Sequence, residues 1–216
     1  MSDSEPSSPK QSTFIEQARR AQLVAGAIET IAEVGYAQAS LVRVAERSGT
    51  TKGVLTYHFK DKQDLVQAAW DEVIRRGVEH VQPLVLAQST GAGMLRTYIE
   101  ANLDFMARYP SHMIALYEIF ANARDPGGEP MYDSDTLDAL VAPLEGLLRS
   151  FQEAGELGQF DPGSMAFAIR GAIDAVPVRL ARQRDLDIGH YAAELAAAFD
   201  RATRPCPAAE GRGERT

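Results

Sequence analysis

The chain has 216 residues, of which 45% are hydrophobic and 24% are charged, and its formal net charge is -8. This length is enough for one or two domains with a well-packed core. No apolar run approaches the roughly 18 residues that a membrane span needs, so we expect no membrane partner. The single cysteine, Cys206, cannot form an intrachain disulfide, and we therefore expect a reducing, cytoplasmic location.

The N-terminal segment 1–12 is rich in Ser and Pro, which predicts a disordered tail without the apolar core of a secretory signal. A helix is expected from about Thr13 to Val34, with Gly35 as the left-handed residue that ends it. Apolar residues at helical spacing form its expected buried face. These residues are Phe14, Ala18, Leu23, Ala27, Ile28 and Ile31.

Residues 40–49 predict a short helix that leads into a tight turn. Ser40 stands where an N-cap accepts a bond from the first backbone N–H groups of a helix. Gly49 stands where a left-handed residue ends one. Three apolar residues at helical spacing give this helix an inward side, namely Leu41, Val44 and Ala45.

A second short helix is expected after Thr51, which can cap it, with Leu55 and Phe59 on its inner side. Its outer side then carries a lysine, a glycine, hydroxyls, a tyrosine and a histidine, which suit phosphates and base edges. The residues on this side are Lys52, Gly53, Val54, Thr56, Tyr57 and His58. The pattern predicts a helix-turn-helix, and an ordinary helical hairpin with a polar outer face is the alternative.

A long helix follows, with Asp61 as its N-cap and Asp64 three residues later, and Pro83 should kink or end it. Five more helices are expected, at about 94–109, 110–123, 134–154, 162–182 and 188–202, and no run of residues predicts a strand. The expected fold is all-α, with about nine helices. The expected parts are a tail 1–12, a DNA-binding domain 13–64, a larger helical domain 65–203 and a second disordered tail 204–216.

The charge is distributed unevenly along the chain. Residues 1–64 carry eight Lys or Arg and eight Asp or Glu, so their net charge is zero, and residues 65–216 carry the whole -8. Within 40–62, five basic residues face two acidic ones, a local charge of +3. A neutral-to-basic head on an acidic body would orient the head toward DNA, although runs of charge are usually solvated faces.

Ser40–Leu65 resembles the DNA-binding domain of the TetR family of bacterial transcriptional repressors. The length of the chain and the amphipathic helix before Ser40 are also similar. Thr50 and Thr56 depart from the family pattern, which more often has an aliphatic residue and a tyrosine at these places. The residues that carry the resemblance are Ala45, Gly49, Thr51, Lys52, Gly53, Leu55, Tyr57, His58, Phe59, Lys62 and Leu65.

The resemblance implies that the second short helix enters the major groove of double-stranded DNA. There Gly53 would let the backbone come close, and Lys52, Val54 and Thr56 would face the bases. For His58 a half-buried structural role, and for Arg43 a solvated position, remain alternatives. The residues expected to contact phosphates are Ser40, Thr51, Tyr57, His58, Lys62 and Arg43.

The resemblance also implies a homodimer on a palindromic operator, because one head reads only a few base pairs. Helices 162–182 and 188–202 are dense in small residues, which let helices approach closely and pair with their symmetry mates. The alternative is that these alanines simply favour helix formation. The expected interface residues are Phe167, Gly171, Ala175, Ala192, Ala196 and Phe199.

TetR-like proteins commonly bind a small molecule in the larger domain and then release DNA, so the resemblance implies a small-molecule effector. We expect the effector to shift the population toward a conformation in which the long helix after Asp61 has moved. A largely apolar pocket with a few polar groups is what such a site requires. Plain core is the alternative for each of its residues. They are Asn102, Phe105, Met106, His112, Met113, Tyr117, Phe120, Arg170 and Asp174.

An enzyme is the main rival class. The four histidines, His58, His80, His112 and His190, are scattered, and there is no HExxH, GxSxG or phosphate-binding glycine loop. We therefore expect no catalytic residue, no metal site and no cofactor. A helical partner-binding protein is a second rival, and within the family an activator or a ligand-independent regulator is a third.

Overall fold

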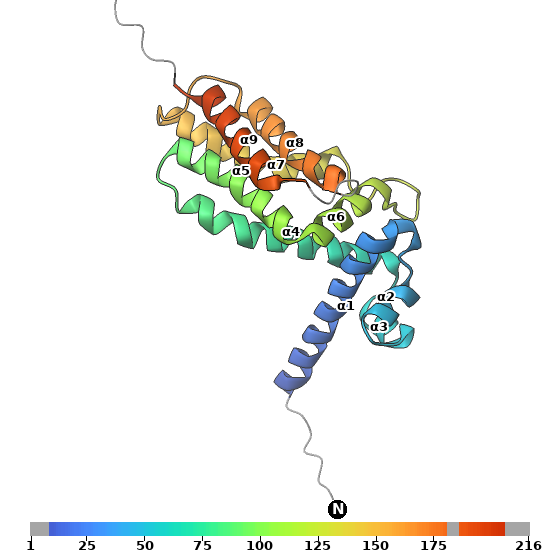
Figure 1. Ribbon diagram of the computed structural model, residues 1–216. Coiled ribbons are helices and arrows are strands. Elements are labelled where there is room, and N and C mark those ends of the chain that lie inside the picture. The colour runs from blue at the N-terminus through green and yellow to red at the C-terminus, as the bar shows by residue number, and fades with distance from the viewer. Residues whose placement is uncertain (1–8, 181–185, 206–216) are drawn as a thin grey trace, which may run out of the picture. The chain divides into compact units, whose positions relative to one another are not determined.

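The computed structural model describes residues 9–180 and 186–205 (Figure 1). Within these ranges the chain forms nine helices, and Arg124 and Pro130 form an isolated β-bridge, so the all-α prediction is confirmed. None of the helices in these ranges is long and apolar enough to cross a membrane. The predictions for Cys206 and for residues 1–8, 181–182 and 206–216 lie outside the described residues. The helices are α1 Pro9–Gln38, α2 Leu41–Arg47, α3 Lys52–His58, α4 Lys62–Leu86, α5 Gly91–Arg108, α6 Pro110–Asn122, α7 Ser134–Glu153, α8 Pro162–Leu180 and α9 Ile188–Thr203.

The described residues form two compact units. Unit 1 contains the residues up to Arg76 together with Tyr109–Tyr132, and unit 2 contains Gly77–Arg108 and the residues from Asp133 onward. The helix α4 therefore begins in unit 1 and ends in unit 2, while α6 belongs to unit 1, where it packs on α1. The functional boundary between residues 64 and 65 remains a prediction.

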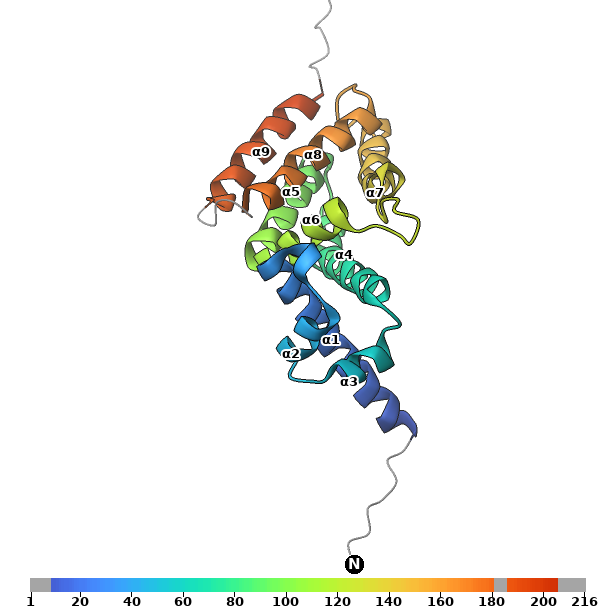
Figure 2. The ribbon, with the colours of Figure 1, turned by 90° about the vertical axis from the view of Figure 1, so that its right-hand side faces the viewer.

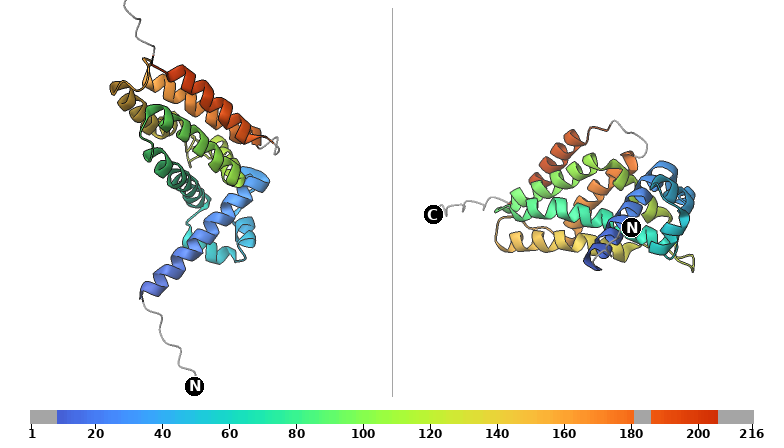
Figure 3. Two further views of the ribbon diagram at one scale, coloured as in Figure 1. Left: turned by 60° about the vertical axis from the view of Figure 1, so that its left-hand side comes forward. Right: turned by 90° about the horizontal axis from the view of Figure 1, so that it is seen from below.

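The first helix is longer and less covered than the sequence predicts. It begins at Pro9, before the predicted start at Thr13, and residues 14–22 are all exposed. Phe14 has 71% of its surface exposed and Ala18 is exposed too, so their assignment to the buried face is wrong. Figure 3 shows the reason, because this end of α1 continues past α2 and α3, which cover the later turns only. Leu23 and Ile28 are buried as predicted.

The helix α1 changes direction at Gly35, whose φ is 78° and ψ 161°, a backbone conformation that favours glycine. One more helical stretch follows to Gln38. The peptide groups of Tyr36 bind two other helices at this bend. Its N–H donates to the Glu118 carboxylate of α6 at 3.0 Å, and its carbonyl accepts from Lys62 Nζ of α4 at 2.6 Å. The bend is therefore fixed from two sides within unit 1.

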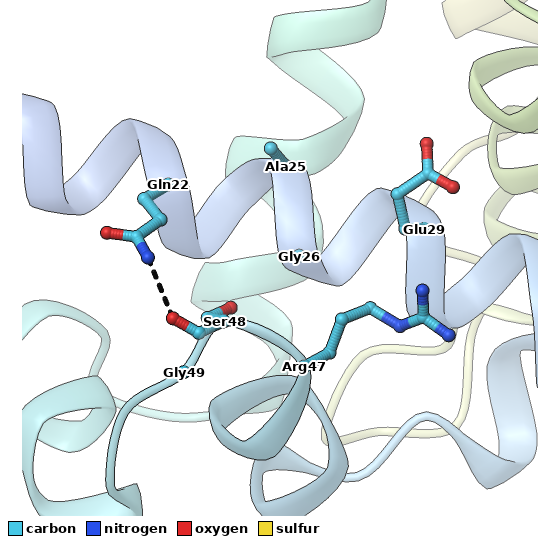
Figure 4. Close-up of a pocket in the computed structure, with 7 residues that line it drawn as sticks. All are labelled: Gln22, Ala25, Gly26, Glu29, Arg47, Ser48 and Gly49. Carbon is cyan, nitrogen blue, oxygen red and sulfur yellow. Dashed lines mark hydrogen bonds between the residues drawn. The ribbon is translucent and has the colours of Figure 1, made fainter.

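The helices α1 and α2 approach each other most closely at Gly26 and Ser48, beside a hollow that seven residues line (Figure 4). A Cβ at Gly26 would lie 2.1 Å from Ser48 Oγ, so the Ser48 side chain would have to shift. The Gln22 amide donates to the Ser48 carbonyl at 2.7 Å and closes one end of the contact. With Ser48 in place, a glycine at position 26 avoids this clash. The lining residues are Gln22, Ala25, Gly26, Glu29, Arg47, Ser48 and Gly49.

The start of α4 has the predicted cap. The Asp61 carboxylate accepts from the Asp64 N–H at 2.9 Å, and the Asp64 carboxylate accepts from the Lys60 N–H at 3.0 Å, so two exposed donors are satisfied reciprocally. Pro83 does not end the helix, which continues to Leu86.

Unit 2 is formed by the end of α4 with α5, α7, α8 and α9. The helix α5 packs along α9 and also contacts α8 and α7, while α7 and α8 pack on each other (Figure 2). The core contains apolar side chains from all of these helices. Its buried residues include Leu95, Ile99, Leu103, Leu144, Leu148, Ile169, Ile173 and Ala196.

Candidate nucleic-acid interface

Hydroxyl caps start both short helices of the head. Ser40 Oγ accepts from the Arg43 N–H at 3.3 Å and Thr51 Oγ1 accepts from the Val54 N–H at 3.4 Å, as predicted. Gly49 between them has a φ of 64°. Both hydroxyls are exposed and use a lone pair for the cap, so each can still donate its own proton to an acceptor outside the protein.

The inner side of α3 is buried and its outer side is not. Leu55 is fully buried and Phe59 is 1% exposed, which fixes α3 against the rest of unit 1. On the outer side Tyr57 is 76% exposed and Val54 is 37% exposed. The Tyr57 ring meets the half-buried His58 ring edge-on at 5.1 Å. A large aromatic side chain that is held in place yet mostly in solvent is available to a partner.

Gly53 lies inside α3, where alanine would favour the helix. A Cβ placed on it would meet only Thr51 Oγ1, at an ordinary 3.7 Å, and its φ is not positive. Neither packing nor backbone conformation in the described protein therefore requires a glycine here. Gly53 leaves a stretch of helix surface without a side chain next to Lys52, and both residues are exposed.

The hydroxyl of Thr56 is occupied within its own helix. Its Oγ1 donates to the Lys52 and Gly53 carbonyls, both at 3.1 Å. The methyl group is then the part of this exposed side chain left for a contact with a base, which is compatible with the expected position of Thr56 facing the bases.

Two predicted phosphate contacts also have partners within the protein. Lys62 Nζ, which donates to the Tyr36 carbonyl, lies 4.2 Å from the centre of the Tyr36 ring, and burial lowers the pKa of Lys62. The Arg43 guanidinium donates to the Gln38 side chain at 3.2 Å on the surface. Lys62 holds the bend of α1 through these contacts and keeps two more N–H donors for other acceptors.

The family model described as "Bacterial regulatory proteins, tetR family" matches residues 23–69, which include α2, α3 and their caps. This part of the chain is thus a TetR-family domain, and the match supports a transcriptional regulator of that family.

Curated relatives match up to about half of the chain. The HTH-type transcriptional regulator BetI of Cronobacter sakazakii is 29% identical over 107 residues, which are 49% of this chain and 53% of the relative. BetI of Yersinia pestis strain Pestoides F is 33% identical over 88 residues, 40% of this chain and 44% of the relative. The chain thus spans about half the length of the curated relatives it matches.

Solved structures share the fold along most of the chain. The fatty acid degradation regulator FadR from Bacillus halodurans has a TM-score of 0.72 at 19% identity, over 90% of this chain and 96% of that chain. FadR from Bacillus subtilis, solved with stearoyl-CoA, has a TM-score of 0.71 at 20% identity, over 83% and 96%. AibR, solved with isovaleryl coenzyme A and operator DNA, has a TM-score of 0.70 at 19% identity, over 83% and 97%.

The residues predicted to line an effector pocket are divided between the two units, so each group is described by itself. In unit 2, Arg170 and Asp174 form an ion pair with Nε 2.8 Å from Oδ2, and Arg170 also donates to the Asn102 amide oxygen at 3.2 Å. Burial alone would lower the pKa of Arg170, but the Asp174 carboxylate outweighs it and the pKa is raised. Phe105 and Met106 are buried, which fits the alternative of plain core.

In unit 1 the other four predicted pocket residues lie on α6. Met113 is buried, and the Phe120 ring stacks on Trp70 of α4 with centroids 6.4 Å apart. His112 and Tyr117 are half-buried. Burial and the nearby Arg76 guanidinium lower the pKa of His112, against the opposing effect of Glu29 and Glu72.

The predicted dimer residues differ in exposure. Phe167 is 64% exposed, and Gly171 and Ala175 on the same helix α8 are exposed too. Ala192 and Ala196 are buried within unit 2 on α9, so they have almost no surface to offer a second copy. Phe199 is half-buried. The spacing of alanines alone could not show which side of α9 its own unit covers.

Sequence reasoning missed three residues with distinctive surroundings. Glu118 binds the backbone at the bend of α1, and no short-range pattern links residues so far apart in the chain. Arg20 lies over the Phe59 ring beside α3. Lys60, counted only as part of the local charge, follows directly after α3 and is exposed.

Proposed function

We propose that this TetR-family chain is a dimeric DNA-binding repressor that a small, largely apolar ligand releases from a palindromic operator. The observation that carries the proposal is the outer side of α3, where exposed Lys52, Val54, Thr56 and Tyr57 surround a glycine that the fold does not require. Chromosomal DNA is the partner that fits this side, which would place the protein in the cytoplasm.

In this proposal α3 lies in the major groove. Lys52 reaches guanine O6 or N7, and Val54 and the Thr56 methyl group contact thymine methyl groups. Ser40, Thr51, Tyr57 and His58 fix the head on phosphates, which positions α3 without reading sequence. The hydroxyls of Ser40 and Thr51 serve this purpose while they cap their helices.

A second copy doubles the number of base pairs that are read, and α8 offers a surface for it. Phe167, Gly171 and Ala175 are exposed at four-residue spacing, so they lie on one side of the helix. An aromatic side chain next to two small residues gives apolar area and close approach at once. We place the dimer contact on this side of α8, with half-buried Phe199 of α9 at its margin.

The effector is proposed to bind in the predicted helical domain 65–203. Two proteins of the same fold were solved with stearoyl-CoA and isovaleryl coenzyme A, so acyl chains are the first apolar groups to test, both as free acids and as coenzyme A thioesters. Ligand binding would favour an arrangement in which α4 moves and the two heads change their separation. Two half-sites one helical turn apart require heads about 34–36 Å apart or a multiple of this, so a shift of a few ångströms weakens binding.

The test uses fluorescence anisotropy with a duplex taken from beside the protein's own gene, at graded salt, and sedimentation of the same sample. The proposal expects a dimer that binds with a steep salt dependence and releases the duplex when an effector binds. Phe167→Glu should give folded monomers that bind the duplex more weakly. A monomeric wild-type protein, or no complex even at low salt, would contradict it.

A further inference from the structure

The exposed end of α1 carries two neighbouring arginines in different surroundings. The Arg19 guanidinium donates to the Gln22 amide oxygen at 2.9 Å. The Arg20 guanidinium instead lies 4.6 Å from the centre of the Phe59 ring. Phe59 is the C-cap residue of α3 and is buried, so Arg20 is held at the C-terminal end of the helix proposed to enter the groove.

The contact between Arg20 and Phe59 fixes the position of a charge without neutralising it. One face of the guanidinium packs on the ring, an arrangement that holds the long side chain in place. Its N–H donors have no hydrogen-bond acceptor or carboxylate partner among the residues that the structure describes. Two other arginines of the head are engaged, since Arg43 donates to Gln38 and Arg47 is paired with Glu33.

A second cation lies near the same end of α3. Lys60 follows Phe59 directly and is exposed, and its backbone N–H binds the Asp64 carboxylate at 3.0 Å, which fixes the main chain there. Seven residues of helix rise about 10 Å, and the major groove is about 12 Å wide with phosphates along both edges. The Thr51 hydroxyl at one end of α3 and these cations at the other can therefore reach phosphates on both edges of one groove.

From this arrangement we propose that Arg20, supported by Lys60, contacts a DNA phosphate at the C-terminal end of α3. The inference rests on the proposed function, because it assumes that α3 lies in a groove. It adds a contact from α1, outside the two short helices, on the strand opposite to the one that the Thr51 hydroxyl would contact. Phe59 then has two roles, as a core residue of unit 1 and as the surface that orients Arg20.

A merely structural role for Arg20 is the competing explanation. In that case the arginine only covers the edge of the Phe59 ring, and its removal lowers stability without changing how binding depends on salt. A phosphate contact has a separate signature, because each phosphate that is neutralised releases counterions and contributes about 0.9 to the slope of log K against log salt.

The experiment measures affinity for a mixed-sequence duplex between about 50 and 200 mM salt. Arg20→Gln should lower the magnitude of the slope by about 1 and weaken binding by about three- to tenfold. Arg20→Lys keeps the charge and should keep the slope. Arg19→Gln is the matched control, because its side chain points about 100° away around the same helix, and it should leave the slope unchanged.

Unfolding temperatures are measured for every variant. If Arg20→Gln does not stay folded, Arg20→Met replaces it, because its apolar stem still covers the Phe59 ring, and the same loss of slope is expected. A slope equal to that of the wild type in a folded, uncharged variant overturns the inference alone. If the wild-type protein itself shows no salt-dependent binding, the proposed function fails instead.

Discussion

The carboxylate of Glu118 accepts a hydrogen bond at 3.0 Å from the backbone N–H of Tyr36, 82 residues earlier in the chain. This bond joins α6 to the bend of α1, where a Cβ at Gly35 would already lie 3.3 Å from the same carboxylate oxygen. Because Lys62 of α4 binds the carbonyl of Tyr36, one residue connects three helices of unit 1. The head is thus anchored to α6 as well as to α4.

Removing this carboxylate should destabilise unit 1. Glu118→Ala leaves a half-buried N–H without an acceptor, which costs about 1–3 kcal/mol of unfolding free energy. Glu118→Gln retains an acceptor oxygen and should cost less than half as much. Urea denaturation followed by the fluorescence of Trp70, the single tryptophan and a buried residue of unit 1, measures both. Equal losses for the two variants would show that the negative charge, rather than the hydrogen bond, matters here.

The approach of α1 to α2 predicts a strong coupling between two positions. Gly26→Ala places a Cβ 2.1 Å from Ser48 Oγ and should destabilise the protein by about 1–3 kcal/mol through overpacking. Ser48→Ala should be nearly neutral, because this buried hydroxyl has no hydrogen-bond partner among the described residues. In the Ser48→Ala background the closest remaining atom is the Cβ at 3.4 Å, so Gly26→Ala should cost much less. Additive effects in this double-mutant cycle would contradict the geometry.

Gly53 predicts a trade-off between stability and binding. Gly53→Ala should raise the unfolding free energy by about 0.5–1 kcal/mol, because alanine favours a helix and the added Cβ meets only Thr51 Oγ1 at 3.7 Å. The same methyl group should weaken DNA binding by about tenfold, or about 1.4 kcal/mol, by keeping the backbone away from the groove. Thermal unfolding and anisotropy on one sample test both effects. An unchanged DNA affinity of Gly53→Ala would show that close approach of the backbone to the groove does not explain the glycine at position 53.

The lowered pKa of His112 predicts a dependence of stability on pH. Burial and Arg76 disfavour the protonated ring in the folded state, so the unfolded state takes up a proton at higher pH than the folded state does. The stability contributed by the neutral ring is complete above the ordinary histidine pKa of about 6.5 and is lost as the pH falls below it. His112→Gln should therefore lose less stability than the wild type between pH 8 and 5.5. Parallel curves of unfolding free energy against pH for the two proteins would refute this prediction.

Much of the head could be predicted because its signals are local. Ser40, Thr51 and Asp61 cap helices as their positions in the sequence predict, and Leu55 and Phe59 lie on the buried side of α3. Caps and helical spacing depend on residues three or four apart, which a single sequence displays directly.

What could not be predicted depends on which elements cover which surface. Helical spacing placed Phe14 on a buried face, but among the described residues no neighbouring helix covers that end of α1. The density of small residues and the family resemblance predicted a dimer interface that includes Ala192 and Ala196, whereas unit 2 covers both residues itself. The contacts of Glu118 with Tyr36 and of Arg20 with Phe59 join residues far apart in the chain, and they become visible only in the folded protein.

The central claim is that the outer side of α3 reads DNA sequence, and selection of duplexes from a random-sequence pool tests it most directly. The wild-type protein should enrich a palindrome, and Tyr57→Phe should enrich the same palindrome with lower affinity. Lys52→Ala should enrich a palindrome changed at a guanine position, since it removes a contact to a base. Enrichment of the identical sequence by Lys52→Ala and the wild type, or of no sequence at all, would contradict the claim.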